Sequence, residues 1–349
     1  MGERVAMPLR EVILFRQFRG KVTWFAIGFF IVLGVSAPVS GQGAKEVTLA
    51  WSARSGSMGP VWVGEEAGIF KRYGINSRLV FIDSGSLAMT TLVAGSTEVV
   101  MVAGSPPVLA AAGGTEVVMF LSLFQGLPYQ FYVDSSFKSV KDLQGKKIAV
   151  ARFGSTSDFA TRLALKNLGI EPTKDVALVQ VGSTSARGAA LKAGTVYGTL
   201  ASPPENVVLK KMGYKMIYDL ITSKSPFQFT GATALRSQIA QNPNLFERLV
   251  KALSHSIYTF KTQKNFSEQV IAKYLRLDDR EAVEEGYEYY SKNMQEIPYV
   301  TPAGFQTIIE DLAQQNPKVR SVNPEKIVDN RFVRKLEDEG FFRSLYRKK

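Results

Sequence analysis

Cysteine is absent from all 349 residues of the chain, and histidine occurs once, at His255. Without cysteine there is no disulfide, no thiolate metal site and no cysteine nucleophile. His255 stands among apolar residues in an amphipathic stretch, 243–261, which is typical of a structural histidine. The sequence also has no histidine–carboxylate spacing typical of a metal site and no glycine-rich phosphate loop ending in Gly-Lys-Ser or Gly-Lys-Thr. We therefore expect no catalytic residue, no metal, no cofactor and no enzymatic activity.

Concentrated positive charge is missing too, although the formal net charge is +12, from 43 basic and 31 acidic side chains. The basic residues are scattered and form neither a basic helix nor a zinc-finger pattern of the kind that binds nucleic acid. We expect a basic, solvated surface, no nucleic-acid partner and a mild attraction for anionic ligands. A hydrophobic content of 45% and a charged content of 21% are ordinary for a soluble protein of about two domains.

The longest apolar run lies near the N-terminus. Basic residues in 16–21 precede the apolar run 22–35, and small, turn-forming residues follow as far as Gly41. This order is typical of a secretory signal peptide, so we expect residues 1–41 to be removed by cleavage near Gly41, leaving a periplasmic protein. An uncleaved membrane anchor is the alternative, although the run is shorter than the roughly 20 residues that span a bilayer. Because no cysteine follows the run, a lipoprotein anchor is excluded.

An internal repeat organises the rest of the chain, with an offset of 99 residues between its two copies. Segment 80–96 begins Val-Phe-Ile-Asp-Ser-Gly-Ser and ends Leu-Val-Ala-Gly-Ser. Segment 179–195 begins Val-Gln-Val-Gly-Ser-Thr-Ser and ends Leu-Lys-Ala-Gly-Thr. Each copy leads into an apolar strand and a Ser-Pro-Pro triplet, at 105–107 and at 202–204. Such a repeat indicates that one supersecondary unit occurs twice.

The repeat extends upstream, where each copy is preceded by a short apolar strand, at 47–51 and at 148–151. A helical stretch follows each strand and ends in Gly-Ile, as expected where glycine stops a helix. Each half therefore reads strand, helix, strand, helix, strand, which predicts α/β lobes with mixed or parallel sheets flanked by helices. One continuous, doubly wound sheet is the alternative to two lobes.

Serine, threonine and glycine cluster where these strands end. Ligands of open parallel sheets bind outside the carboxyl ends of the strands, where helix N-termini offer unpaired N–H donors. The same residue types are also needed simply to begin a helix, so only their convergence favours a shared site. The candidate ligand-binding residues are Arg54, Ser55, Gly56, Ser57, Ser84, Gly85, Ser86, Gly104, Ser105, Arg152, Gly154, Ser155, Thr156, Ser183, Thr184 and Ser202.

Three arginines at these strand ends are candidates for holding an anion. Arg152 directly follows a strand and is the first choice for a carboxylate, sulfonate or phosphate, and Arg54 has the matching position in the first half. Arg187 falls in the first turn of a predicted helix, where a cation opposes the helix dipole, so another role is indicated. Aromatic side chains that would sandwich a ligand ring are Phe153, Phe124, Tyr129 and Trp62, all of them equally compatible with the core.

Three segments carry a resemblance to a known family. Segment 59–75 reads Gly-Pro-Val-Trp-Val-Gly-Glu-Glu-Ala-Gly-Ile-Phe-Lys-Arg-Tyr-Gly-Ile, 92–96 leads through an apolar strand to Gly-Ser, and 138–150 contains Asp-Leu-Gln-Gly-Lys-Lys-Ile. They resemble the substrate-binding proteins of nitrate, sulfonate and taurine transporters, also called the NMT1/THI5-like or thiamine-pyrimidine-synthase-like group. The resemblance covers about residues 45–345 and does not name a ligand.

The resemblance implies a type II periplasmic-binding fold with two lobes. Lobe 1 would comprise 45–131 and 232–349, lobe 2 would comprise 132–231, and hinge segments would lie near 129–133 and 229–232. A small molecule, anionic or aromatic, would bind between the lobes of a monomer, and closure would present it to an ABC-transporter permease in the inner membrane.

The C-terminal third of the chain is expected to add helices to lobe 1. Thr301-Pro302 is a helix start, and 336–346 reads as one terminal helix. Two other functions stay open: a membrane-tethered ligand sensor that keeps its N-terminal segment, and a thiamine-pyrimidine-synthase-like enzyme. The enzymes of that group depend on histidine and a cysteine cluster, which this chain lacks.

Overall fold

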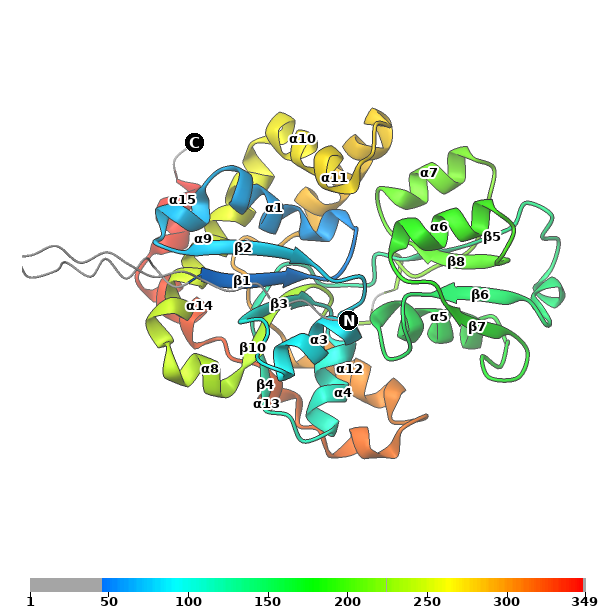
Figure 1. Ribbon diagram of the computed structural model, residues 1–349, viewed down its shortest axis with the longest axis horizontal. Coiled ribbons are helices and arrows are strands. Elements are labelled where there is room, and N and C mark those ends of the chain that lie inside the picture. The colour runs from blue at the N-terminus through cyan, green and yellow to red at the C-terminus, as the bar shows by residue number, and fades with distance from the viewer. Residues whose placement is uncertain (1–45, 224, 348–349) are drawn as a thin grey trace, which may run out of the picture. The chain divides into compact units, whose positions relative to one another are not determined.

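Two five-stranded sheets form the centre of the chain, as seen in a computed structural model that describes residues 46–223 and 225–347. Figure 1 shows the two groups of strands, each flanked by helices. The expected signal peptide at 1–41 lies outside the described residues. The division into two sheets confirms the two-lobed α/β expectation and rules out one continuous sheet.

The first sheet has the strand order β2-β1-β3-β10-β4. Strands β1 and β3 run parallel, and β10 runs antiparallel between β3 and β4. The central strands are buried on both faces, which explains their uninterrupted apolar sequences, such as Val-Val-Met-Val in β3. The strands are β1 (Glu46–Trp51), β2 (Asn76–Phe81), β3 (Val99–Val102), β4 (Val117–Ser122) and β10 (Gly231–Leu235).

The second sheet repeats this pattern with the order β7-β6-β8-β5-β9. Strands β6, β7 and β8 are parallel, and β5 lies antiparallel between β8 and β9. The equivalence of the two sheets reflects the sequence repeat. The strands are β5 (Gln130–Val133), β6 (Lys147–Val150), β7 (Ala177–Gln180), β8 (Gly198–Ala201) and β9 (Lys215–Asp219).

Helices connect the parallel strands and cover both sheets (Figure 1). The first lobe, as we use the term, is the first sheet with α1–α4 and α8–α15, and the second lobe is the second sheet with α5–α7. The helices of the first lobe are α1 (Gly59–Glu66), α2 (Ile69–Arg72), α3 (Gly85–Val93), α4 (Ser105–Ala112), α8 (Arg236–Gln241), α9 (Pro243–Thr262), α10 (Lys264–Leu275), α11 (Arg280–Asn293), α12 (Pro302–Leu312), α13 (Pro324–Ile327), α14 (Arg331–Asp338) and α15 (Phe341–Tyr346). Those of the second lobe are α5 (Thr156–Asn167), α6 (Thr184–Lys192) and α7 (Glu205–Lys211).

The chain passes twice between the sheets. It leaves the first sheet at Ser122 and enters the second at Gln130, and it returns between Asp219 and Gly231. The expected lobe boundaries, at 131/132 and 231/232, fall inside β5 and β10, directly after these passages. The hinge segments stay predictions about how the molecule moves.

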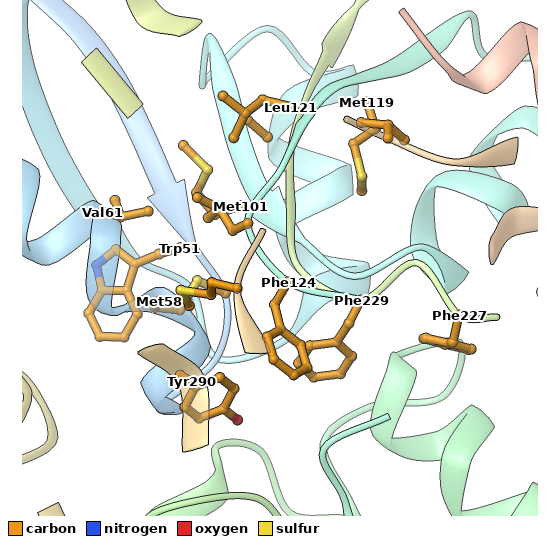
Figure 2. Packing of buried hydrophobic residues seen from close by; sticks show 14 of the residues in the cluster. Trp51, Met58, Val61, Met101, Met119, Leu121, Phe124, Phe227, Phe229 and Tyr290 are labelled. Atoms are coloured by element: carbon orange, nitrogen blue, oxygen red, sulfur yellow. The ribbon is translucent and has the colours of Figure 1, made fainter. Parts of the chain in front are cut away.

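Aromatic side chains fill the region where the passages leave the first sheet. Figure 2 shows Phe124 and Phe229, one from each passage, packed beside each other and close to Tyr290 of α11. The ring centroids of Phe124 and Phe229 are 6.1 Å apart, and those of Phe124 and Tyr290 are 5.0 Å apart, both edge to face. This packing joins the two crossing segments to a helix of the C-terminal third.

The C-terminal helices differ in part from expectation. Helix α12 begins at Pro302 after Thr301, as expected. The single helix expected over 336–346 is wrong: α14 ends at Asp338 and α15 begins at Phe341. Gly340 between them has φ +74°, a left-handed conformation that interrupts the helix and that glycine adopts without strain. Helix α14 packs on β4 and α9, so these helices belong to the first lobe.

Candidate functional site

A cavity lies between the two lobes, at the carboxyl ends of their parallel strands. It offers about 40 Å³ to the centre of a water-sized sphere, whereas a single water needs only about 10–15 Å³. The space therefore suits a small ligand rather than an extended one. We call this space the cleft cavity. Its wall consists of Ser52, Ala53, Met58, Asp83, Ser84, Gly85, Ala103, Tyr129, Ala151, Ser155, Thr156, Ser157, Ser183, Thr184, Arg187, Phe229 and Thr230.

Three helices begin at the cleft cavity, one in the first lobe and two in the second. They are α3, α5 and α6, and Ser84, Ser155 and Ser183 are their N-caps. Each serine hydroxyl accepts a hydrogen bond from the backbone N–H three residues further on, at 3.2, 3.3 and 3.3 Å respectively. The positive ends of three helix dipoles therefore face one small space, which favours an anion there.

Arg187 is the cation of the cavity wall, and only 3% of its surface is exposed. Its guanidinium donates to the carbonyl oxygen of Gly182 at 2.9 Å, to Thr199 Oγ1 at 3.1 Å, to the carbonyl oxygen of Leu200 at 3.3 Å and to Thr184 Oγ1 at 3.4 Å. All four acceptors are neutral. These contacts hold the guanidinium in place and leave its charge available to a ligand.

No carboxylate of the described residues lies within 4.0 Å of Arg187, so its charge lacks a direct counter-ion there. Burial lowers the pKa of Arg187 below its usual value, and the electrostatic influence of Glu205 and of the Tyr129 hydroxyl acts in the opposite direction. Burial raises the pKa of Glu205, an effect that Arg187 partly offsets. A guanidinium stays protonated at neutral pH, so this wall of the cavity is positive.

Part of the cavity wall is apolar. Tyr129 and Phe229, from the two crossing segments, meet edge to face with ring centroids 5.5 Å apart, and Met58 lies nearby on the wall. Burial raises the pKa of the Tyr129 phenol, so it stays neutral. Water is thereby excluded from one side of the space, which strengthens electrostatic contacts within it.

Asp83 and Arg152 face each other across the lobes at the edge of the cavity. Arg152 Nε lies 3.7 Å from Asp83 Oδ1, and their side chains are 47% and 39% exposed. Arg152 thus has a counter-ion and a wetter surrounding than Arg187. An exposed ion pair contributes little to stability, so its position across the lobes is its main feature.

Neither a metal site nor a membrane span accompanies the cavity in the described part of the chain. No group of three or more histidine, aspartate or glutamate side chains there is arranged to hold a metal ion. No helix among residues 46–223 and 225–347 is long and apolar enough to cross a bilayer.

Residues 40–275 match the sequence profile of the NMT1-like family, which is more than half of the chain. The chain belongs to this family. The expected resemblance is thereby confirmed. A relative of this NMT1-like protein in Brucella abortus (strain 2308), provisionally described as a binding protein, is 25% identical over 222 residues, or 62% of this chain and 67% of the relative.

Solved structures share the fold of this NMT1-like protein at low sequence identity. A protein from Bordetella bronchiseptica RB50 superposes with a TM-score of 0.76 at 21% identity, over 84% of this chain and 97% of the other. The alkanesulfonate-binding protein SsuA from Xanthomonas axonopodis pv. citri, bound to MOPS, gives 0.67 at 16%, over 82% and 98%. The periplasmic nitrate-binding protein NrtA from Synechocystis PCC 6803 gives 0.68 at 15%, over 85% and 89%. The fold is therefore that of periplasmic binding proteins.

Of the sixteen candidate residues expected from the sequence of this NMT1-like protein, six lie on the cavity wall. The six come from the starts of three helices in two lobes, which is the convergence expected of strand ends. They are Ser84, Gly85, Ser155, Thr156, Ser183 and Thr184. Their contact with a ligand stays a prediction.

Three further candidates lie buried behind the wall. Ser55 and Ser57 of the first lobe and Ser202 of the second are joined by hydrogen bonds between their hydroxyls, at 3.3 Å for Ser57 to Ser55 and 3.2 Å for Ser202 to Ser55. They therefore act between the lobes and do not line the cavity.

Three candidates of the first lobe make other contacts outside the cavity wall. Arg54 lies over the ring of Phe81, 4.7 Å from its centroid, and donates to the carbonyl oxygen of Tyr274 at 3.1 Å. Gly56 N donates to the carbonyl oxygen of Pro203 at 3.3 Å. The hydroxyl of Ser86 hydrogen-bonds to that of Ser84, 2.9 Å away.

The remaining candidates also lie off the wall. Gly104 N donates to the carbonyl oxygen of Gln228 at 3.0 Å, in an approach too close for a side chain. Ser105 is fully buried beside it. Gly154 has φ +75° and donates to a carboxylate of α5. With Arg152 paired to Asp83, the first-choice anion ligand of the sequence analysis lies at the rim instead of on the wall.

The candidate list missed part of the wall. Ser52, Asp83 and Ser157 carry the same strand-end signal as the named serines and were accessible from sequence. Arg187 and Tyr129 were weighed and left out of the list, because a cation at a helix start and a buried aromatic both have common structural roles. Phe229 and Thr230 come from the second crossing segment, which no strand-end argument reaches; the list of missed wall residues closes with Ala53, Met58, Ala103 and Ala151.

The other aromatic candidates and the histidine lie elsewhere. Trp62 is fully buried in α1, Phe124 is in the core, and Phe153 is half exposed. His255 of α9 lies with Nδ1 3.2 Å from the hydroxyl of Tyr73, away from the cleft cavity.

Proposed function

We propose that this protein is a periplasmic solute-binding protein that captures one small organic or inorganic anion between its lobes. Closure then presents the loaded protein to an ABC-transporter permease of the inner membrane. The proposal includes removal of residues 1–41 as a signal peptide with cleavage near Gly41, and a monomeric mature form. Membership of the NMT1-like family and a fold shared with periplasmic binding proteins support the transport role.

The anionic ligand rests on one observation: Arg187 lies buried on the cavity wall, hydrogen-bonds only to neutral acceptors and has no carboxylate of the described residues within 4.0 Å. A buried charge is costly unless a partner compensates it, and a bound anion supplies that partner. The starts of α3, α5 and α6 add dipoles of the same sign. An aromatic ligand fits less well, because the space is small.

The named relatives support this ligand class. SsuA from Xanthomonas is described as alkanesulfonate-binding and NrtA from Synechocystis as nitrate-binding. We extend to this chain the general character of those ligands, a compact head with negatively charged oxygens. We propose a binding role and not catalysis, because the cavity wall carries no nucleophile paired with a base.

The test is a binding screen on the mature protein after bound ligand has been removed by unfolding and refolding. Nitrate, short alkanesulfonates, short carboxylates, aromatic acids and pyrimidines would be compared by thermal shift and calorimetry. We expect one or more small anions to bind and neutral pyrimidines to be silent. Folded protein that binds none of these classes would overturn the proposal. Chemical conversion of a bound compound would favour the enzyme, and retention of residues 1–41 in the exported protein would favour the tethered sensor.

A further inference from the structure

A chain of buried hydroxyl groups runs from the cavity wall to the contact between the lobes. Thr230, which lines the cavity, donates through Oγ1 to Ser57 Oγ at 3.0 Å. Ser57 Oγ donates to Ser55 Oγ at 3.3 Å, and Ser202 Oγ of the second lobe donates to the same Ser55 oxygen at 3.2 Å. The hydroxyls of Ser55 and Tyr290 are 2.8 Å apart. Ser55 is therefore the meeting point of three branches. We call the five residues that form them, Thr230, Ser57, Ser55, Ser202 and Tyr290, the hydroxyl hub.

The hub accounts for all hydrogen-bonding positions of the Ser55 hydroxyl. A hydroxyl has one proton to donate and two lone pairs to accept. Ser57 Oγ and Ser202 Oγ both donate to Ser55 Oγ, and the Ser57 backbone N–H also donates to it at 3.4 Å, so its acceptor positions are filled and the Ser55 proton is left for Tyr290. Burial, the largest effect, raises the pKa of Tyr290 well above its usual value, so its phenol stays protonated and neutral. The donor and the acceptor of each hydrogen bond at Ser55 are thus assigned.

The hub lies where the backbones of the two lobes also approach each other. Gly56 N donates to the carbonyl oxygen of Pro203 at 3.3 Å. Gly286 of α11 lies so close to Pro204 that a Cβ on it would be 3.0 Å from the Pro204 Cβ. The segment 202–204 of the second lobe therefore sits against two separate parts of the first lobe. The Ser55–Ser202 hydrogen bond is therefore one of several contacts that join the lobes here.

We propose that Ser55 is a positioning residue that stabilises the closed form and links it to the cavity wall through Ser57 and Thr230. The inference rests on the proposed function, because it assumes that the lobes open and close. The Ser202–Ser55 bond exists only when the lobes meet, so its free energy is added to the closed form alone. Bonds in a connected, buried network also polarise one another, so the hub is worth more than its separate bonds. Of the residues in the hub, only Thr230 lines the cleft cavity.

The experiment measures closure directly and needs no knowledge of the natural ligand. Because the chain has no cysteine, two introduced cysteines carry spin labels uniquely. Val93 of the first lobe and Met212 of the second are 48% and 45% exposed and serve as label sites. Distance distributions are recorded for the labelled protein alone and with sodium nitrate and sodium methanesulfonate as probes.

We expect Ser55→Ala and Ser202→Ala each to lower the ratio of closed to open molecules about three- to tenfold, and Tyr290→Phe to do so less. The double variant Ser55→Ala/Ser202→Ala should lose less than the two single losses combined, because one bond is removed in both. Ser254→Ala is the matched control: its buried hydroxyl in α9 has no hydrogen-bond partner among the described residues.

Two results would overturn the hub. One is a closed fraction in Ser55→Ala and Ser202→Ala equal to that of Ser254→Ala. The other is parent protein with no closed population under any of the three conditions. Melting temperatures are measured alongside, since a purely structural role would lower the melting temperature and leave the ratio unchanged. Failure of the ligand screen alone would count against the proposed anion and not against the hub, because the closed fraction is read without ligand.

Discussion

Arg187 carries a charge where charge is costly, and its neighbours show how the cost is met. Four hydrogen bonds to neutral oxygens fix the guanidinium without neutralising it. A carboxylate partner would have stabilised the empty protein and weakened any anion that competes with it. The arrangement therefore suits a residue that completes its ion pair only with a ligand.

Replacing Arg187 should weaken anion binding strongly. For Arg187→Met we expect a loss of about 1.5–3 kcal/mol, the range for hydrogen bonds to charged groups. The loss of binding free energy in Arg187→Lys should be smaller than in Arg187→Met, because lysine keeps the charge but lacks the planar fork. Isothermal titration calorimetry with the anion found in the screen measures both.

Arg152→Met is the control for Arg187, since it also removes an arginine near the cavity. Arg152 is exposed and already paired with Asp83, so its loss should cost at most about 1 kcal/mol. If Arg152→Met weakened binding more than Arg187→Met, the anion would lie at the rim, beside the arginine that the sequence made the first choice.

At the residue scale, the sequence predicted the kind of site better than its members. Ser84, Ser155 and Ser183 were identifiable because helix capping and strand-end position coincide in them. Ser55 also caps a short helical turn and Ser202 also follows a strand, yet their hydroxyls are turned to each other across the lobes. That difference depends on how two distant segments meet, which no local pattern contains.

Helix α11 illustrates how one element constrains closure. Gly286 is buried in its middle, although glycine destabilises a helix interior by roughly 0.5–1 kcal/mol relative to alanine. The close approach of Pro204 explains the choice, since a Cβ at Gly286 would be 3.0 Å from its Cβ and 3.2 Å from its nitrogen. The glycine leaves room for the second lobe.

Gly286→Ala should therefore separate stability from closure. Alanine favours the helix, so we expect an unchanged or raised melting temperature, while the clash with Pro204 lowers ligand affinity about three- to tenfold, or ~1 kcal/mol. Lys292→Ala, at an exposed position of the same helix, controls for helix propensity. If Gly286→Ala bound the ligand as tightly as Lys292→Ala, the added methyl group would be accommodated by a shift of α11 that leaves ligand affinity unchanged.

Helices and strands could be predicted from the sequence wherever the local residue pattern agrees with the place of the segment in the fold. The alternation of strands and helices followed from apolar runs bounded by glycine and serine, and Pro302 marked the start of α12. The antiparallel insertion of β5 and β10 was not derivable from the repeat, because each strand follows a crossing segment outside it. The break at Gly340 was overlooked in a stretch whose apolar residues suit one helix or two.

In the described part of the chain, each ion pair between the lobes joins a basic residue of the second lobe to an acidic residue of the first. Lys211 of the second lobe contacts Asp279 and Glu281 at 2.8 Å each, and Lys166 lies 4.0 Å from Asp311. In these pairs, as in Arg152–Asp83, the second lobe supplies the cation and the first lobe supplies the acid. The lobes therefore attract each other on closing.

This polarity predicts that closure weakens with salt and with acid. Hydrogen bonds to Asp279 and Glu281 raise the pKa of Lys211, and the hydrogen bond from Lys211 lowers that of Asp279. The stabilisation by Asp279 is thus present above its usual pKa of about 4 and is lost as the pH falls through the lowered value. The stabilisation by Lys211 is present at neutral pH and is lost only as the pH rises through its raised pKa.

The closed fraction, measured with the spin labels described above, should fall as the Debye length shrinks from about 30 Å in 0.01 M salt to about 3 Å in 1 M salt. Lys211→Met should make it less sensitive to salt and to pH near 4. Lys335→Met, which removes a pair with Glu247 within the first lobe, should leave both dependences intact. Equal salt dependence in all three proteins would show that these pairs do not act on closure.

The arrangement of the lobes was predictable only through the family resemblance, since a tandem repeat also fits one continuous sheet. The sequence did not predict which residues of the two lobes would meet across the cleft. Contacts such as Lys211–Asp279 join residues of no local relation, and their shared polarity becomes visible only when both lobes are assembled.

The position of β10 also predicts an order of folding. All five strands of the second sheet lie in the continuous segment 130–219, whereas β3 and β4 are joined only through β10, which follows that segment. A ribosome or a translocation channel therefore delivers everything that the second lobe needs before the first lobe can close its sheet. We expect a fragment of residues 126–223 to give cooperative thermal unfolding by circular dichroism, and a fragment of 46–125 to give none. Until β10 arrives, the first lobe exposes two strand edges, which is when the chain most needs a chaperone.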